Sequence, residues 1–228
     1  MYKVVVIGGS GFLGSHVADT LSAQGHEVII FDKSDSKWLS GNQKMVLGDI
    51  LSLEDVKSVI EGADYVYNFA GIADINESLQ SPLKTANLNI IGNLNILESC
   101  RDQYVKRFVY ASSVYVHSKQ GGFYRASKEA SENYIREYQA TYNLDYTILQ
   151  YGSLYGPRAD KTNGLRKIIE SAFNNETISY LGDPESIRSY IHVQDAAQSS
   201  IEILDEKYKN QTLILSGQQS MRVEDLLK

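Results

Sequence analysis

Tyr124 and Lys128 form the residue pair whose types and spacing most directly suggest catalysis in this sequence. On a helix, a spacing of four residues places both side chains on one face. A phenol with a pKa of about 10 is a poor base at neutral pH, but a nearby ammonium group stabilises its phenolate. The pair therefore indicates a general base that takes a proton from a hydroxyl group, although an exposed helix face gives the same pattern.

A serine hydroxyl stands shortly before this pair. The apolar stretch 107–111 is typical of a strand, and Ser112 and Ser113 follow at its carboxyl end. Ser113 can hydrogen bond a substrate hydroxyl or carbonyl and hold it against the Tyr124 oxygen. Ser113, Tyr124 and Lys128 together predict an active site for proton transfer.

A glycine-rich turn follows the first apolar run, residues 2–7. Gly8, Gly11 and Gly14 fit a G-x-x-G-x-x-G spacing, and Gly9 gives the alternative G-x-G-x-x-G spacing. Glycine allows tight dihedrals and a close approach of the backbone to a ligand. The helical pattern that begins at Phe12 would direct its free N–H groups at a pyrophosphate.

An acidic residue ends the second apolar run, residues 27–31. Asp32 is placed to accept a hydrogen bond from a ribose 2′-hydroxyl, and it would repel a 2′-phosphate. The turn and Asp32 therefore predict binding of NAD. A plain βαβ unit with a solvated Asp is the alternative.

Strand-like and helix-like segments alternate, which predicts an α/β fold: a doubly wound parallel sheet, or Rossmann fold. We expect strands at 2–7, 27–31, 44–47, 64–69, 107–111 and 145–149, and helices at 12–21, 52–60, 82–101 and 124–142. Ligands bind beyond the carboxyl ends of such strands. The residues expected at this one rim are Gly11, Asp32, Asp49, Ala70, Ser113 and Tyr151.

The pattern changes at residue 164. We expect a helix at 165–173, strands at 177–181 and 188–192 around a turn at 182–184, a helix at 193–204, an extended segment at 213–215 and a helix from 223. This predicts a Rossmann domain over 1–163. Residues 164–228 would form a small, incomplete substrate-binding lobe interleaved with the last Rossmann elements.

The composition excludes several other classes of protein. The 228 residues carry a net charge of −6, which provides no basic surface for nucleic acid. The one cysteine, Cys100, excludes an internal disulfide and suits a reducing compartment. The four histidines lack the spacing of a metal site, and no apolar run approaches a membrane span. We expect a cytoplasmic protein without metal.

With these motifs the whole chain resembles the extended short-chain dehydrogenase/reductases, in their NAD-dependent sugar epimerase/dehydratase group. The family's adenine-contacting pair corresponds to Asp49 and Ile50, and its Asn-x-x-Gly-Thr helix motif places Asn89 as a structural or catalytic asparagine. The expected catalytic set is Ser113, Tyr124, Lys128 and Asn89. The expected cofactor-binding residues are Gly8, Gly11, Phe12, Leu13, Gly14, Asp32, Lys33, Asp49, Ile50, Phe69, Ala70, Gly71, Asn89, Tyr124, Lys128, Tyr151 and Ser153.

The resemblance also implies a nucleotide-sugar substrate. Segment 187–195 is similar to the family's Arg-Asp-Tyr-x-His-Val-x-Asp signature, in which the arginine binds the diphosphate. An ion pair between Arg188 and Asp183 or Glu185 is the alternative. The expected substrate-binding residues are Ser113, Tyr124, Ser153 and Arg188.

The residues after Ser113 bear on the reaction. Family 4,6-dehydratases carry an Asp-Glu pair there, whereas this chain has Val114 and Tyr115, which disfavours a dehydratase. The family's Val-Tyr-Gly also reads Val-His-Ser at 116–118. A nucleotide-sugar 4-epimerase that works through a 4-keto sugar is the leading hypothesis. An NAD-dependent dehydrogenase or reductase of a sugar or other small alcohol or ketone, a decarboxylase and a non-catalytic dinucleotide sensor are alternatives.

Two further expectations rest on the resemblance alone. Family members usually continue beyond the position of Lys228, where the extra segment completes the substrate-binding lobe. They also imply a homodimer, formed through the helices near 88–97 and 124–142.

Overall fold

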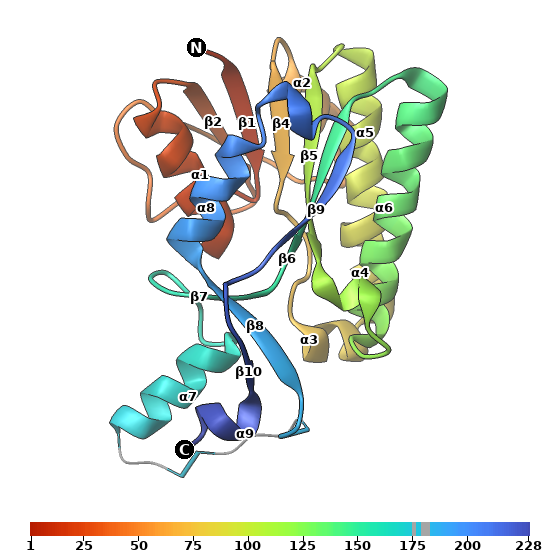
Figure 1. Ribbon diagram of the computed structural model, residues 1–228. Helices are drawn as coiled ribbons and strands as arrows, with labels where there is room; N and C mark the ends of the chain where they lie inside the picture. Colours follow the sequence, from red (N-terminus) through yellow and green to blue (C-terminus); the bar gives the residue numbers. More distant parts are fainter. Residues whose placement is uncertain (175–176, 179–182) are drawn as a thin grey trace.

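The computed structural model describes residues 1–174, 177–178 and 183–228. A central sheet is covered by helices on both faces, and a smaller lobe lies beyond the carboxyl ends of its strands (Figure 1). In the parts of the chain that the structure describes, every helix is too short or too polar to cross a membrane.

The main sheet has seven strands in the order β3-β2-β1-β4-β5-β6-β9, and all neighbouring pairs are parallel. The strand order reverses between β1 and β4, which creates the crevice in which such folds bind ligands. The six expected strands are confirmed, and the extended segment at 213–215 is the seventh. The strands are β1 Lys3–Ile7, β2 Glu27–Asp32, β3 Lys44–Leu47, β4 Tyr65–Asn68, β5 Arg107–Ser113, β6 Tyr146–Tyr151 and β9 Gln211–Leu215.

Two helical layers bury the two faces of this sheet. Helices α1 (Phe12–Ala23) and α8 (Val193–Glu202) cover one face, where Val17, Leu21 and Ala196 join the core. Helices α2 (Leu53–Ile60), α5 (Gly92–Asp102) and α6 (Gly122–Tyr142) cover the other. The layers fix the carboxyl ends of the strands as the open rim.

The helix expected over 82–101 is interrupted. The chain forms α3 (Ile75–Gln80) and α4 (Pro82–Ala86), then a π-helical segment at Asn87–Ile91 before α5. A π segment bonds i to i+5 and so adds a residue to the turn, a feature often found at functional sites. The prediction of one regular helix was therefore wrong at this segment.

The lobe contains a second, three-stranded sheet in the order β10-β8-β7. The predicted helix at 165–173 is confirmed, and the strand at 188–192 begins one residue earlier. The turn falls at 184–185, while most of the strand expected at 177–181, with residue 182, lies outside the described residues. The lobe elements are β7 Ser153–Tyr155, α7 Gly164–Phe173, β8 Ile187–His192, β10 Ser220–Arg222 and α9 Val223–Leu226.

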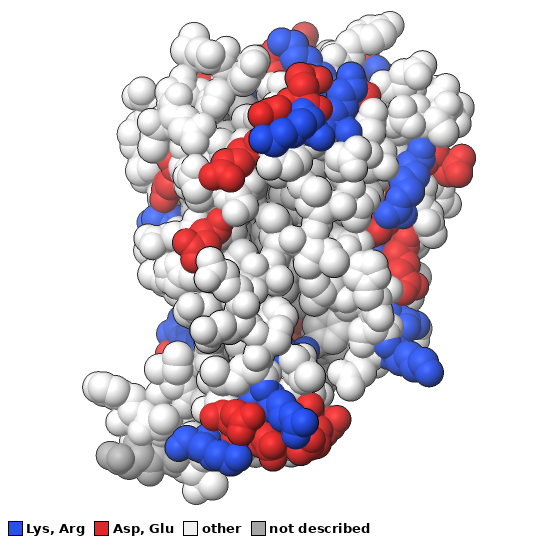
Figure 2. Space-filling model, viewed as in Figure 1, with Lys and Arg blue, Asp and Glu red and all other residues white. Residues whose placement is uncertain are grey.

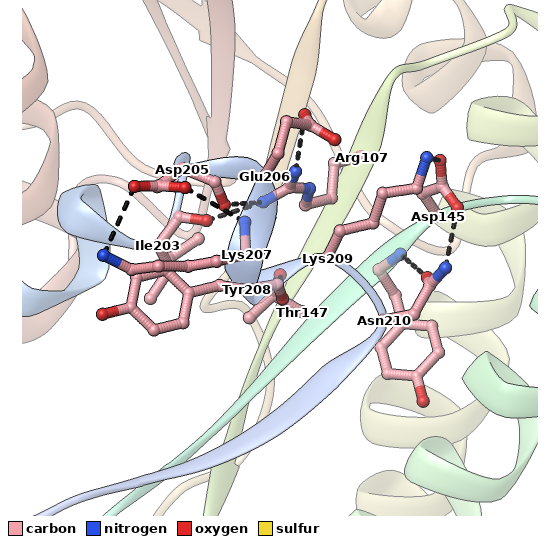
Figure 3. Close-up of polar contacts among 11 residues, drawn as sticks. Arg107, Asp145, Thr147, Ile203, Asp205, Glu206, Lys207, Tyr208, Lys209 and Asn210 are labelled. Atoms are coloured by element: carbon pink, nitrogen blue, oxygen red, sulfur yellow. Dashed lines mark hydrogen bonds and ion pairs between the residues drawn. The ribbon is translucent and has the colours of Figure 1, made fainter.

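A buried arginine anchors the return of the chain from α8 to β9 at the amino end of the sheet (Figure 3). Arg107, which begins β5, is 1% exposed. Its Nη1 donates to the carbonyls of Ile203 and Asp205 at 2.6 and 3.2 Å, and its Nη2 lies 2.9 Å from a Glu206 carboxylate oxygen. Arg107 thus binds three acceptors of the α8–β9 connection to strand β5.

Asn210 completes this anchor next to β6 (Figure 3). Its Nδ2 donates to Asp145 at 2.9 Å, and its Oδ1 accepts from the Tyr146 N–H at 3.0 Å. The Thr147 hydroxyl donates to the Tyr208 carbonyl. These bonds set β9 in register beside β6. Figure 2 shows charged side chains gathered at this end and over the lobe, with fewer between.

Candidate active site

The turn between β1 and α1 is built so tightly that only glycine fits at two positions. Gly8 has φ +78°, and a Cβ there would lie 2.5 Å from the Ala70 backbone nitrogen. A Cβ on Gly14 would lie 2.3 Å from the Gly8 carbonyl oxygen, which already accepts from the Gly11 N–H at 3.1 Å. The turn therefore lies directly against the segment that follows β4.

Helix α1 begins at this turn with an extended Gly11, which has no side chain to cap the helix. Its first turn reads Phe-Leu-Gly-Ser, so the helix brings no carboxylate of its own to its N–H groups. Unpaired N–H groups and the positive end of the helix dipole favour an anion. Phe12 packs edge-on against His16, and Leu13 is buried. The turn and helix end thus fit the pyrophosphate of a dinucleotide.

Asp32 stands at the carboxyl end of β2, beside the same turn. Its two oxygens accept from the backbone N–H groups of Ser10, at 3.1 Å, and Ser34, at 3.3 Å. A carboxylate offers about four acceptor sites, so Asp32 retains acceptor capacity for a ribose hydroxyl. Lys33 follows and is exposed.

Asp49 and Ile50, after β3, face different surroundings. Asp49 is exposed and its Oδ1 accepts from the Leu51 N–H at 2.9 Å. Ile50 is 7% exposed, and its carbonyl accepts from Asn95 of α5. Asp49 is therefore open at the rim, whereas the Ile50 side chain packs into the core.

Asn89 ties the segment after β4 to α6. Its Oδ1 accepts from the Ile72 N–H at 2.7 Å, and its Nδ2 donates to the Ile72 carbonyl and to the Ser127 hydroxyl. A Cβ on Gly71 would lie 2.4 Å from the same Oδ1. These bonds hold the segment after β4 against α6.

The structure brings Ser113, Tyr124 and Lys128 together. The Lys128 ammonium donates to the Ala111 carbonyl at 2.7 Å and lies 5.8 Å from the centre of the Tyr124 ring. Burial lowers the pKa of Lys128 to about 8, and the Glu132 carboxylate opposes this shift. Burial raises the pKa of Tyr124 to about 12, and its hydrogen bond with Ser113 opposes that shift. Burial disfavours the charged form of each group and so moves the two pKa values apart, which leaves the phenol neutral and the ammonium charged at neutral pH.

Arg188 reaches from the lobe to the turn that follows Ser113. Its Nη1 donates to the Tyr115 hydroxyl, and its guanidinium carbon lies 5.5 Å from the centre of that ring. The Tyr115 ring meets Tyr124 edge-on at 6.2 Å. Glu185, one of the carboxylates considered for Arg188, pairs with Arg222 at 2.8 Å. The Tyr115 side chain therefore lies between Arg188 and the phenol of Tyr124.

The side chains of Tyr151 and Ser153 lie in different surroundings. The Tyr151 hydroxyl lies 2.6 Å from the Ser200 hydroxyl of α8, in the buried layer between α1, α8 and the sheet. Successive strand residues point to opposite faces, so Tyr151 points away from its neighbour Gln150, which faces α6. The Tyr151 side chain is therefore directed into the layer between the sheet and α8. Ser153 begins β7 and is half-buried beside Tyr190 of β8.

Sequence reasoning missed two residues of this region. The sequence presents Tyr115 only as a replacement for a dehydratase acid, yet it links Arg188 to Tyr124. Glu132 belongs to none of the motifs. Its signal was available, because it follows Lys128 by four residues and so shares its helix face.

Comparison with known proteins identifies one family. The model of the NAD dependent epimerase/dehydratase family matches residues 4–214. A putative UDP-glucose 4-epimerase from Methanocaldococcus jannaschii is 26% identical, over 98% of this chain and 79% of that protein. A UDP-N-acetyl-alpha-D-glucosaminuronate decarboxylase from Bacillus cytotoxicus is 25% identical, over 98% of this chain and 78% of that protein.

A solved structure shares the fold over almost the full chain. The UDP-glucose 4-epimerase from Thermotoga maritima, crystallised with UDP-glucose, is 27% identical with a TM-score of 0.92. The alignment covers 99% of this chain and 80% of that chain.

Proposed function

Because the chain belongs to the NAD-dependent epimerase/dehydratase family, we propose that it is a nucleotide-sugar 4-epimerase acting through a 4-keto sugar. Membership confirms the resemblance found in the sequence and makes the chain an NAD-dependent enzyme. The observation that carries the proposal is the cluster of Ser113, Tyr124 and Lys128 at the rim that also holds Asp32 and the glycine turn.

Each residue of this cluster has a distinct task in the proposal. Tyr124 takes the proton of the sugar 4-hydroxyl and later returns it. Burial raises the pKa of this phenol to about 12, so its phenolate needs the adjacent Lys128 ammonium. Ser113 orients the reacting oxygen by hydrogen bonding. NAD, held by the glycine turn and Asp32, would supply a reversible hydride acceptor next to these residues.

The binding residues follow the rim. We assign the pyrophosphate to the N–H groups of the glycine turn and the first turn of α1, and the ribose to Asp32. Arg188 and Ser153 contact the nucleotide sugar, and Tyr151 contributes only its backbone. The remaining cofactor-contacting residues in the proposal are Lys33, Asp49, Ile50, Phe69, Ala70 and Gly71.

An epimerase is favoured over a dehydratase by the residues after Ser113. Val114 and Tyr115 begin the short 3₁₀ turn Val114–His117, and neither supplies a carboxyl group to expel water. A dehydrogenase, reductase or decarboxylase remains the second candidate, because Tyr124, Lys128 and Ser113 also suffice for net oxidation or reduction.

Two associated properties belong to the proposal. A homodimer would join α5 and α6, which carry exposed apolar side chains such as Tyr134 and, just before α5, Ile91. Residues 164–228 would act as the substrate-binding lobe of a cytoplasmic enzyme. Sedimentation at several protein concentrations would detect the dimer, and a monomer throughout would exclude it.

The function is tested by incubating the protein with NAD and a panel of UDP-, GDP-, CDP- and dTDP-sugars. Products are separated by chromatography and NADH is followed by absorbance. A new isomer of equal mass without lasting NADH establishes an epimerase and identifies its substrate. Steady NADH formation assigns a dehydrogenase, and silence with every sugar rejects the nucleotide-sugar proposal.

A further inference from the structure

The proposed mechanism does not use a buried carboxylate that lies next to it. Glu132 is 4% exposed and follows Tyr124 and Lys128 on the same face of α6. Its Oε1 accepts from the Ser112 hydroxyl at 2.5 Å and from Gln150 Nε2 at 2.9 Å. Its Oε2 accepts from Arg136 Nη2 at 2.7 Å. A buried charge is retained when it is paired and hydrogen bonded in this way.

The side-chain oxygen of Gln150 extends this network to the turn after Ser113. Because Gln150 Nε2 donates to Glu132, its Oε1 is an acceptor. His117 Nε2 lies 2.7 Å from that oxygen and must therefore carry the proton that it donates. His117 is the last residue of the turn Val114–His117, which begins directly after Ser113. One chain of hydrogen bonds thus joins Glu132 to the turn.

Glu132 also acts on the charge of Lys128. The groups that face Lys128 are the Tyr110 ring from β5, at 4.7 Å, the Tyr124 ring, at 5.8 Å, and Glu132. Arg136 and His117 face Glu132 from its other sides. Burial lowers the pKa of Lys128, and the negative carboxylate raises it.

We propose that Glu132 is a positioning residue of the active site, which keeps Lys128 protonated and holds the Ser113 turn through Ser112, Gln150 and His117. The kinetic consequence rests on the proposed function, because a phenolate at Tyr124 is stabilised only while Lys128 is charged. The effect on the Lys128 charge does not rest on it.

The decisive experiment is Glu132→Gln in the full chain with NAD present, which removes the charge and keeps the shape. The ¹³Cε resonance of Lys128, assigned with Lys128→Met, is titrated with pH. We expect its midpoint to fall by about one unit, since residues four apart on a helix are neighbours and a nearby opposite charge shifts a pKa by about one to three units. At pH 7 such a fall lowers the charged fraction of Lys128 about twofold, so kcat falls about twofold with little change in KM, and the alkaline limb of its pH profile moves to lower pH.

The matched control is Glu129→Gln, on the same helix. Glu129 is 41% exposed and lies 3.5 Å from Arg125, so its loss leaves both readouts unchanged. An unshifted Lys128 midpoint in Glu132→Gln, or an equal shift in the control, would overturn the proposal. If the wild type proves inactive with every sugar, the proposed function fails while the titration still decides the role of Glu132.

A second variant tests the link to the turn and also serves if Glu132→Gln does not fold. His117→Ala keeps the Glu132 charge and removes only the donor to Gln150. We expect kcat to fall several-fold while the Lys128 midpoint stays in place. An unchanged kcat would reject the link, and a shifted midpoint would show that the turn rather than Glu132 controls the charge.

Discussion

The polar groups at the two ends of the main sheet differ in their surroundings. At the amino end, Arg107 binds two carbonyls and a carboxylate of the α8–β9 connection, and Asn210 of that connection binds Asp145 just before β6 (Figure 3). At the carboxyl end, helix α1 begins without a side-chain cap, and burial shifts the pKa values of Tyr124 and Lys128. Polar groups that are hydrogen bonded within the protein stabilise the fold. Groups with shifted pKa values and an uncapped helix end are available for proton transfer and for ligands.

The contrast extends to charge. Lys207, Lys209 and Arg107 at the amino end each have a carboxylate within 3.3 Å. Lys128 at the carboxyl end instead contacts a carbonyl and lies 4.7 and 5.8 Å from the centres of two aromatic rings. A lysine held in this way keeps a proton that it can lose near neutral pH. Changes at the carboxyl end should thus alter rates, and changes at the amino end should alter stability.

The largest effect is expected from Tyr124→Phe. Removing the hydroxyl deletes the general base, which contributes about 10²–10⁴-fold to a rate, so we expect kcat to fall about 10³-fold. The unfolding midpoint in urea should stay close to that of the wild type. Tyr134→Phe, on an exposed tyrosine of the same helix, is the control. A variant that retains a tenth of the activity would show that another group takes the proton.

Arg107→Met tests the other end of the sheet. The variant leaves the Ile203 and Asp205 carbonyls without their donor, and we expect a loss of about 3 kcal/mol in the free energy of unfolding. Urea denaturation measures the loss. The kcat per folded molecule should be unchanged at low temperature. A stable variant with reduced kcat would mean that the two ends are coupled.

The pH dependence of the wild type should show a moderate effect. The pKa of Lys128 is lowered to about 8, so its ammonium is lost above that pH, and the Tyr124 phenolate loses its stabilising charge. We expect kcat to fall towards tenfold for each pH unit above about 8. Initial rates from pH 6 to 10 measure this limb. Rates that keep rising to pH 10 would contradict the assigned role of Lys128.

The smallest effect is expected from Lys209→Ala at the amino end. Its ammonium lies 2.6 Å from Asp145, but the lysine side chain is 41% exposed. Exposed ion pairs contribute less than about 1 kcal/mol, so urea denaturation should show a loss within that range and no change in kcat. If Lys209→Ala lost as much free energy of unfolding as Arg107→Met, exposure would not explain how much each residue of this anchor contributes to stability.

The sequence determined the features that depend on neighbours along the chain. Alternation of apolar runs predicted the sheet strands, and glycine spacing predicted the turn at Gly8 and Gly14, because these positions are restricted by backbone geometry. A spacing of four placed Tyr124 and Lys128 on one face of α6. The family resemblance added the reaction class, which periodicity alone does not contain.

Only the tertiary structure decided which distant groups meet. Period-two alternation puts Gln150 and Tyr151 on opposite faces of β6, but packing decides that Gln150 meets Glu132 and that Tyr151 meets Ser200. Asn89 lies in a π-helical segment that the sequence pattern did not predict, and it accepts from the N–H of Ile72 in another segment. Such contacts arise from the packing free energy of segments far apart in sequence, and local patterns therefore do not encode them.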